Sequence, residues 1–348
     1  MNLNGQEIPA NKSSTMPRPP TDLSVKPKNF AVTGVAGYVA TRHLKAIYET
    51  GNRVIACLDP SDSVGFLDQY SDEIRFFTEF ERFDRHLEKL KREKDSAEHP
   101  HYLSICSPNY LHDAHIRSAL RLGCDAICEK PVVLNPWNVD ALQELEIKSG
   151  RKVYTILQLR VHPTILKLKK ELDLNPKAFH EIELTYCTSR GSWYDFSWKG
   201  DPKLSGGLAT NIGIHFFDMF IWLFGAVQTC EVHLSEDRRA AGYLELERGR
   251  VRWFLSVNRS DVPFETAGKP QVTYRSIKID GKDIEFSEGF HDLHTKLYQE
   301  ILKGRGFGLE QARPSVLLVH DIRHAKTIGA QTYSHPLVKN ILGSIKHD

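Results

Sequence analysis

Short apolar runs alternate with longer segments of helical spacing through the first half of the chain. The apolar runs lie at residues 30–33, 53–58, 102–106 and 125–128. Helical spacing, with apolar residues three and four positions apart, marks residues 38–50, 112–122 and 137–149. This rhythm predicts βαβ units, which associate through right-handed crossovers into a doubly wound parallel sheet of Rossmann type.

The pattern changes after Gly150, where β-type runs follow one another with fewer helices between them. These runs lie at residues 153–157, 180–186, 229–234, 243–246, 251–258 and 276–280. Helical stretches lie at residues 163–172, 211–224, 290–303 and 309–328. We therefore predict an α+β domain with a mostly antiparallel open sheet, so that the whole chain is α/β with two different sheets.

Three segments follow from these patterns. Residues 1–28 are polar and proline-rich, which is typical of a disordered tail. Residues 29–150 form the predicted Rossmann domain, and residues 151–348 form the predicted domain for substrate binding and oligomerisation. A length of 348 residues suits two cores better than one.

Charge, cysteine content and the longest apolar stretch indicate which ligands and cellular surroundings the sequence favours. The 46 basic and 44 acidic residues leave a net charge of +2, which gives no indication of nucleic acid or anionic membrane as a partner. The six cysteines form no C-x-x-C pair and read as reduced thiols of a cytoplasmic protein, and we predict no metal site. The apolar stretch at residues 214–227 is too short to span a membrane and reads as a core helix.

A glycine loop follows the first predicted strand and opens the first predicted helix. Its cofactor-binding candidates are Gly34, Ala36, Gly37, Tyr38 and Val39. Glycines in this position allow backbone N–H groups to approach a dinucleotide pyrophosphate at the helix N-terminus. The same turn can also exist for steric reasons alone.

Asp59 ends the second predicted strand, at the distance along the chain expected of a carboxylate that binds both ribose hydroxyls. Such a carboxylate repels a 2′-phosphate, so NAD is favoured over NADP. The structural alternative is an Asp-Pro turn with a helix cap at Ser61 or Asp62.

Two further loops lie at the carboxyl edge of the predicted parallel sheet, where open α/β sheets bind ligands. The first contributes Ser107, Pro108, Asn109 and His112 as cofactor-binding candidates, although a turn with an N-cap explains it as well. The second is Glu129-Lys130-Pro131, in which Lys130 can hold or move a proton near the nicotinamide. Taken alone, it is also a common exposed strand end.

A glycine-rich run, Gly206 to Asp218, passes into the apolar helix. Asn211, His215 and Asp218 are spaced to share one helix face, so that Asp218 can orient His215 as an acid–base group. The alternative is a core histidine whose hydrogen bonds are satisfied by Asp218.

Together these motifs resemble the Gfo/Idh/MocA oxidoreductases over residues 29–330, including the closing segment from Gly308 to Ala312. Within that family the sequence is most similar to the UDP-N-acetylglucosaminuronate 3-dehydrogenases of WlbA type, which serve synthesis of surface polysaccharides such as bacterial O-antigen and lipopolysaccharide. The segments that carry this narrower resemblance lie at residues 34–43, 104–112, 156–160, 188–194, 197–202 and 251–257.

The resemblance implies NAD-dependent oxidation of the C3′ hydroxyl of UDP-N-acetylglucosaminuronic acid. It makes Lys130 and His215 the acid–base candidates, with Asn211 and Asp218 beside them, and implies that the Lys130-Pro131 bond can be cis. We favour His215 as the base and Lys130 as the group that polarises the ketone, and the reverse assignment stays open. Related enzymes regenerate NAD with 2-oxoglutarate, which makes that acid a candidate partner.

A UDP-sugar acid carries a pyrophosphate and a carboxylate, so its site needs cations. The candidates are Arg160, Arg190 and Lys199. Stacking candidates are Trp193, Tyr194 and Trp198, although aromatic residues beside glycines also pack loops. The remaining substrate-binding candidates are Gln158, Ser197, Asn211 and His215.

Two other functions remain open from the sequence. The enzyme can act on another sugar or on a cyclitol, because fold does not fix substrate. The chain can also be a non-catalytic NAD-binding regulator, although retention of both Lys130 and His215 disfavours this. By resemblance we expect a homodimer or a homotetramer.

Overall fold

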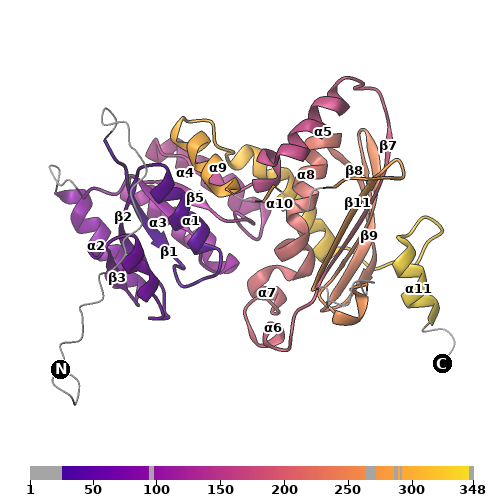
Figure 1. Cartoon of the computed structure of the whole chain (residues 1–348), viewed down its shortest axis with the longest axis horizontal. Helices are drawn as coiled ribbons and strands as arrows, with labels where there is room; N and C mark the ends of the chain where they lie inside the picture. Colours follow the sequence, from indigo (N-terminus) through magenta and orange to yellow (C-terminus); the bar gives the residue numbers. More distant parts are fainter. Residues whose placement is uncertain (1–25, 94–97, 264–271, 286–288, 291, 345–348) are drawn as a thin grey trace, which may run out of the picture.

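The computed structural model describes residues 26–93, 98–263, 272–285, 289–290 and 292–344, and contains two six-stranded sheets beside each other (Figure 1). The predicted tail at residues 1–28 lies almost wholly outside the described residues. The two sheets confirm the predicted α/β class with two different kinds of sheet.

The first sheet is parallel throughout and has the order β3-β2-β1-β4-β5-β6. Its strands are β1 (Asn29–Thr33), β2 (Arg53–Leu58), β3 (Arg75–Phe77), β4 (Tyr102–Ile105), β5 (Asp125–Cys128) and β6 (Val153–Thr155). Its helices are α1 (Ala40–Glu49), α2 (Phe80–Arg92), α3 (His112–Leu122) and α4 (Pro136–Ser149). The predicted Rossmann-type sheet is confirmed.

Two features of this sheet differ from the sequence patterns. The run at residues 153–157 was expected in the second sheet, but β6 pairs with β5 and completes the first sheet, so that assignment is wrong. The strand β3 and the helix α2 were not located by the patterns. The helix α2 is mostly charged and buries only Phe83, Leu87 and Leu90, one residue per turn.

The second sheet has the order β12-β11-β7-β10-β9-β8 and is antiparallel except between β7 and β10. Its strands are β7 (His180–Thr188), β8 (Val227–Ser235), β9 (Arg239–Leu246), β10 (Gly249–Ser256), β11 (Thr273–Ile279) and β12 (Lys282–Asp283). The helices of this half are α5 (Pro163–Asp173), α6 (Trp193–Phe196), α7 (Pro202–Ser205), α8 (Ile214–Phe224), α9 (Leu293–Leu302), α10 (Leu309–His324) and α11 (Pro336–Ser344). The predicted mostly antiparallel sheet is confirmed.

The apolar helix α8 lies against the second sheet, where the ring of Phe217 meets that of Trp253 edge-on at 5.2 Å between centroids. The segment Pro202–Phe224 has the length and composition of a membrane-crossing helix, but 67% of its most apolar window is buried inside the fold. Figure 1 shows α8 and α10 on the side of the second sheet that faces the first, and α11 on the opposite side. The helix therefore serves as a core element, as its pattern predicts.

The chain returns to the first sheet near its end. Leu297, Tyr298 and Ile301 of α9 are buried in the same hydrophobic cluster as Phe30 and Val32 of β1. Tyr298 is fully buried, and its ring lies 5.9 Å from that of Phe30. The first sheet thus owes part of its core to residues that follow the second sheet.

Candidate active site

A cavity of about 1430 Å³ lies at the carboxyl ends of β1, β2, β4 and β5 and extends to residues of the second half. Most of the residues singled out from the sequence line it. They are Gly34, Ala36, Gly37, Tyr38, Val39, Asp59, Ser107, Pro108, Asn109, His112, Glu129, Lys130, Gln158, Arg190, Trp193, Tyr194, Trp198, Lys199, Asn211 and His215. Arg160, Ser197 and Asp218 are not among its lining residues.

The glycine loop passes so close to the end of β4 that no side chain fits at Gly34. A Cβ atom there would lie 2.5 Å from the Cys106 carbonyl carbon and 2.5 Å from the Ser107 nitrogen, and Gly34 has a φ of +73°. Both constraints require glycine. Residues of this loop line the cavity just before α1, a position that fits a dinucleotide pyrophosphate at the helix N-terminus.

Asp59 joins this loop to the end of β2. Its Oδ2 accepts a hydrogen bond from the Ala36 nitrogen at 3.0 Å, and its Oδ1 accepts one from the Ser61 nitrogen at 2.9 Å. The second bond forms the turn that the structural alternative predicted, but the helix cap at Ser61 or Asp62 is wrong, because the next helical turn is Gly65–Gln69 with Val64 before it. The position of Asp59 beside the cavity is the one that ribose recognition requires. The two interpretations of Asp59 are therefore compatible.

His112 holds two loops of the site together. Its Nδ1 lies 2.7 Å from the carbonyl oxygen of Pro131, and its Nε2 lies 2.8 Å from that of Ser107. Burial lowers the pKa of His112, and these two carbonyl oxygens oppose that shift because they favour the doubly protonated ring. His112 thereby holds Pro131 against the loop of Ser107, and the Lys130-Pro131 bond that precedes it is cis, as the resemblance implied.

Lys130 reaches across the cavity to the second half of the chain. Its Nζ donates a hydrogen bond to the carbonyl oxygen of Asn211 at 2.8 Å. Asn211 lies in a π-helical turn, Ala209–Gly213, that precedes α8, and such turns release backbone carbonyl groups from the regular helical pattern. Burial lowers the pKa of Lys130, Glu129 opposes that shift, and Lys199 adds to it.

His215 lies one turn further along and faces the same cavity. Burial, and then the charge of Lys130, lower the pKa of His215 well below its ordinary value. Within the described part of the chain, its ring nitrogens make no hydrogen bond, so the neutral ring is available to a ligand. Lys130 and His215 are therefore brought together as a candidate acid–base pair.

Asp218 does not orient His215, which corrects the sequence prediction and also its alternative. Both carboxylate oxygens of Asp218 accept hydrogen bonds from Arg160, from Nε at 2.9 Å and from Nη2 at 2.7 Å. The two side chains are 7% and 4% exposed. A buried carboxylate needs a cation with matching geometry, and the planar guanidinium supplies it. Arg160 is therefore not a cation that is available to substrate.

Ser197 has a structural position as well. Its Oγ donates to the Tyr194 carbonyl oxygen at 3.0 Å and accepts from the Lys199 nitrogen at 3.2 Å. These bonds close the turn that carries Lys199 into the cavity. Ser197 therefore positions a candidate substrate ligand without lining the cavity itself.

Three cations of the second half line the cavity: Arg190, Lys199 and Arg275. The Nζ of Lys199 lies 5.7 Å from the ring centroids of both Trp193 and Trp198. The sequence prediction missed Arg275, although the strand pattern carries a signal. Arg275 occupies the same face of β11 as Ile277, which is 2% exposed, and an arginine in an apolar stripe indicates a ligand or a buried partner.

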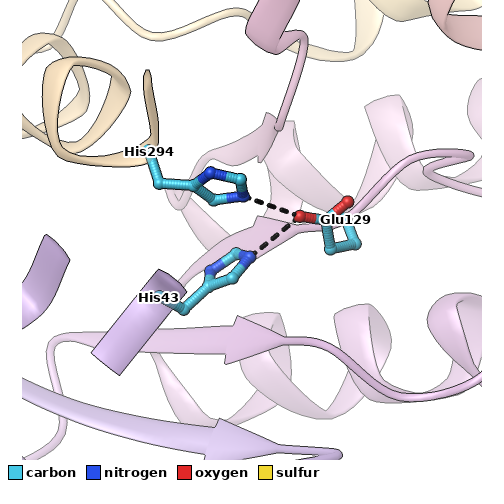
Figure 2. A group of neighbouring side chains, drawn as sticks. All are labelled: His43, Glu129 and His294. Carbon is cyan, nitrogen blue, oxygen red and sulfur yellow. Dashed lines mark hydrogen bonds and ion pairs between the residues drawn. The ribbon is translucent and has the colours of Figure 1, made fainter. Parts of the chain in front are cut away.

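Glu129 belongs to a buried cluster with His43 of α1 and His294 of α9 (Figure 2). Its Oε1 lies 3.0 Å from the Nε2 of His43 and 3.1 Å from the Nε2 of His294. The three ligand atoms all lie within 4.8 Å of one another, a spacing that a metal ion could also use. Both His–Glu distances are ordinary hydrogen-bond lengths, so two N–H donors satisfy the carboxylate directly.

Family models match most of the described chain. The NAD-binding Rossmann fold of the Gfo/Idh/MocA oxidoreductase family matches residues 28–156, and the C-terminal α/β domain of that family matches residues 179–321. The chain is a Gfo/Idh/MocA oxidoreductase. The NAD cofactor predicted from the glycine loop and from Asp59 agrees with this family's description.

Among curated relatives of this family member, D-glucoside 3-dehydrogenase of Escherichia coli is 29% identical over 143 residues, which is 38% of this chain and 39% of that protein. Inositol 2-dehydrogenase of Rhizobium meliloti is 26% identical over 209 residues, which is 56% of this chain and 54% of that protein. The matched region thus spans less than two thirds of either relative.

A solved structure matches this oxidoreductase over nearly its full length. The WlbA (WbpB) dehydrogenase of Thermus thermophilus, in complex with NAD and UDP-GlcNAcA, is 50% identical, with a TM-score of 0.85 and coverage of 89% of this chain and 99% of that chain. The same protein is also known in complex with NAD and α-ketoglutarate. The WlbA dehydrogenase of Bordetella pertussis is 16% identical with a TM-score of 0.69 and shares the fold. The predicted resemblance to WlbA-type dehydrogenases is confirmed.

Proposed function

We propose that this oxidoreductase oxidises the C3′ hydroxyl of UDP-N-acetylglucosaminuronic acid to the 3-keto sugar with NAD as acceptor. The observation that carries the proposal is the 50% identity to the Thermus thermophilus enzyme, whose structure holds NAD and UDP-GlcNAcA. A large cavity that is lined by residues of both halves of the chain supports it, because cofactor and sugar must meet.

The residues at the glycine loop fit NAD. The backbone from Gly34 to Val39 would hold the pyrophosphate, and Asp59 would accept hydrogen bonds from the adenosine ribose. When bound, NAD supplies the acceptor for the hydride that leaves C3′. The protein must then place the sugar hydroxyl beside its proton acceptor.

His215 is the proposed proton acceptor. Burial holds the pKa of His215 well below its ordinary value, which favours the neutral ring, and among the described residues this ring has no hydrogen bond that must first be broken. Lys130, held by the Asn211 carbonyl, keeps further N–H donors for the sugar oxygen and would stabilise it as the C–H bond breaks. The C3′ oxygen thus loses its proton to His215, the carbon loses its hydride to NAD, and a carbonyl remains.

Arg190, Lys199 and Arg275 would neutralise the substrate's anionic groups in a chain whose net charge is only +2. Trp193 and Trp198 flank Lys199 and would offer flat surfaces to the uracil or sugar ring. These three cations all come from the second half of the chain, whereas the glycine loop comes from the first half, as separate cofactor and substrate sites require.

Several finer expectations accompany this proposal. The Thermus thermophilus complex with α-ketoglutarate supports 2-oxoglutarate as the acceptor that regenerates NAD. A cytoplasmic location, a role in surface polysaccharide synthesis and a homodimeric or homotetrameric state are proposals that accompany the resemblance. Another sugar or cyclitol substrate is the alternative outcome of the test below.

The test uses purified protein with UDP-N-acetylglucosaminuronic acid, NAD and 2-oxoglutarate, with nucleotide sugars followed by mass spectrometry. We expect a product lighter by two hydrogen atoms in the wild type and in a control variant, Lys148→Met, which changes an exposed lysine. The product should be lost in Lys130→Met and in His215→Asn. Turnover of other sugars in place of the UDP-sugar acid would contradict the proposed substrate, and absence of any turnover would favour a regulator.

A pH profile distinguishes the two candidate bases. If His215 accepts the proton, kcat should fall only below pH 6.5, because burial lowers the pKa of His215 from that value. A limb of the profile that lies well above pH 6.5 and disappears in Lys130→Met would instead identify Lys130 as the base.

A further inference from the structure

The carboxylate of Glu129 is held from two directions by histidines that come from distant parts of the chain. His43 lies on α1 and His294 on α9, and both Nε2 atoms point at the same oxygen of Glu129 (Figure 2). The other oxygen, Oε2, accepts from the backbone nitrogen of Lys130 at 3.3 Å. Glu129 is therefore linked both to the interior of the fold and to the peptide that carries Lys130.

The hydrogen bonds behind His43 determine which of its nitrogens carries the proton. The hydroxyl of Tyr298 lies 2.7 Å from the Nδ1 of His43 and 2.7 Å from the Oγ of Ser104. If Ser104 donates to Tyr298 and Tyr298 donates to Nδ1, then Nε2 carries the hydrogen that His43 gives to Glu129. Burial lowers the pKa of His43, which agrees with this neutral ring.

Glu129 is ionised although it is 7% exposed. Burial alone would raise the pKa of Glu129, but the hydrogen bonds from His294 and His43, together with the electrostatic attraction of these two side chains, outweigh burial and hold that pKa well below its ordinary value. In the described part of the chain, its ion pairs are made with these histidines alone. Among the described residues no arginine or lysine forms a direct ion pair with this carboxylate, so its charge can act on Lys130 over a longer distance.

That charge acts on Lys130. Burial lowers the pKa of Lys130, and the nearby charge of Lys199 lowers it further. Glu129 is the group that opposes both, because a buried carboxylate favours the ammonium form of its neighbour. The ammonium form is the one that can stabilise a developing negative charge on the sugar oxygen.

We propose that His43 and His294 are positioning residues that keep Glu129 ionised as the counterion of Lys130. This inference rests on the proposed function, in which Lys130 contacts the sugar oxygen. Neither histidine lines the cavity, so both act through Glu129. The other titratable groups that face Glu129 or are influenced by its charge are Tyr298 of α9, Cys106 after β4, Cys128 of β5, His112 of α3 and His215 of α8.

The test measures the titration of Lys130 without any sugar. Competitive acetylation of the full-length protein across a pH series, followed by peptide mass spectrometry, reports the midpoint at which Lys130 becomes reactive. We expect Glu129→Gln to lower that midpoint by about one pH unit or more, as for the loss of a neighbouring opposite charge. His43→Leu and His294→Leu should lower it less, in the same direction.

The matched controls are His43→Gln and His294→Gln, whose side-chain N–H can still donate to Glu129, and these should restore most of the wild-type midpoint. An unchanged midpoint in Glu129→Gln, which preserves shape, would overturn the proposal even if the leucine variants do not fold. Equal effects of leucine and glutamine would also overturn it, because packing alone would then explain the loss.

Elemental analysis of the purified protein adds an independent readout. About one tightly bound zinc ion per chain would overturn the proposal, since the histidines would then be metal ligands in place of hydrogen-bond donors. Because the acetylation measurement needs no substrate, a normal Lys130 titration without sugar turnover would refute the proposed function and leave the role of the histidines intact.

Discussion

The pairing of Arg160 with Asp218 leads to a clear prediction about Asp218→Asn. Both side chains are buried, and two hydrogen bonds of 2.7 and 2.9 Å join them. Asparagine keeps the shape but removes the charge, which leaves the guanidinium of Arg160 without its anion. Among the described residues, the other hydrogen-bond acceptor of Arg160 is the carbonyl oxygen of Gln311 at 3.0 Å, which is neutral.

The size of the effect follows from the burial of both partners. Removing one member of a buried ion pair costs about 3–5 kcal/mol, because the other charge stays out of water. At about 2.1 cal/mol/K of unfolding entropy per residue, that loss corresponds to a fall of roughly 4–7 °C in Tm for a chain of 348 residues. Since neither side chain lines the cavity, kcat and KM of the folded variant should stay near those of the wild type.

The assay combines thermal unfolding of the wild type and of Asp218→Asn with steady-state kinetics well below both midpoints. A second variant, Arg160→Met with Asp218→Leu, removes both charges and should be more stable than Asp218→Asn, because no buried charge remains unpaired. A variant Asp218→Asn that keeps its Tm and binds NAD but loses turnover would refute this reasoning and return Asp218 to the chemistry.

Three further outcomes follow from the structure. Gly34→Ala should weaken NAD binding measured by calorimetry, because its Cβ would meet backbone atoms at 2.5 Å. Gly123→Ala, at a similar φ of +79° but with open space around it, should lower Tm without that loss. Asp59→Ala should reduce the preference for NAD over NADP in competitive binding, because the carboxylate no longer repels a 2′-phosphate, and an unchanged preference would remove Asp59 from ribose recognition. Burial lowers the pKa of His335 from 6.5 to about 4, so between these pH values the unfolded chain binds a proton that the folded chain does not. The contribution of His335 to the free energy of unfolding is therefore complete above pH 6.5 and falls toward pH 4. His335→Gln should remove this part of the pH dependence, measured by urea denaturation.

Local signals in the sequence were sufficient for the strands β1, β2, β4 and β5 of the first sheet and for the loops that follow them. The helix α3 has the predicted bounds, residues 112–122, because its apolar spacing is regular and Gly123 ends it in the left-handed conformation. The three-residue strand β3 could not be located, since three residues carry no period. The helix α11 was missed although Val338 within it is fully buried, because its nine residues are too few for a clear helical period.

Local patterns could not predict contacts between residues that are far apart in the sequence. The pattern marked residues 153–157 as a strand, but which sheet it joins depends on the pairing of β6 with β5. Asp218 was correctly placed on the helix of His215, yet its hydrogen-bond partner, Arg160, lies 58 residues away in the sequence. The spacing of residues along one helix cannot show whether Asp218 pairs with His215 or with a residue from another element. His294 lies 165 residues from Glu129, and no motif connects them.

The packing of α9 against β1 has a consequence for how the chain is made. The strand β1 is synthesised first, but its core is completed by α9 residues that are synthesised after the whole second sheet, namely Leu297, Tyr298 and Ile301. During translation, part of the apolar interior of the first sheet therefore stays exposed to solvent until α9 has been synthesised. A fragment cut at residue 150 would keep Phe30 and lose the residues that cover it, so expression of the nucleotide-binding half alone would need α9 supplied in trans or by fusion.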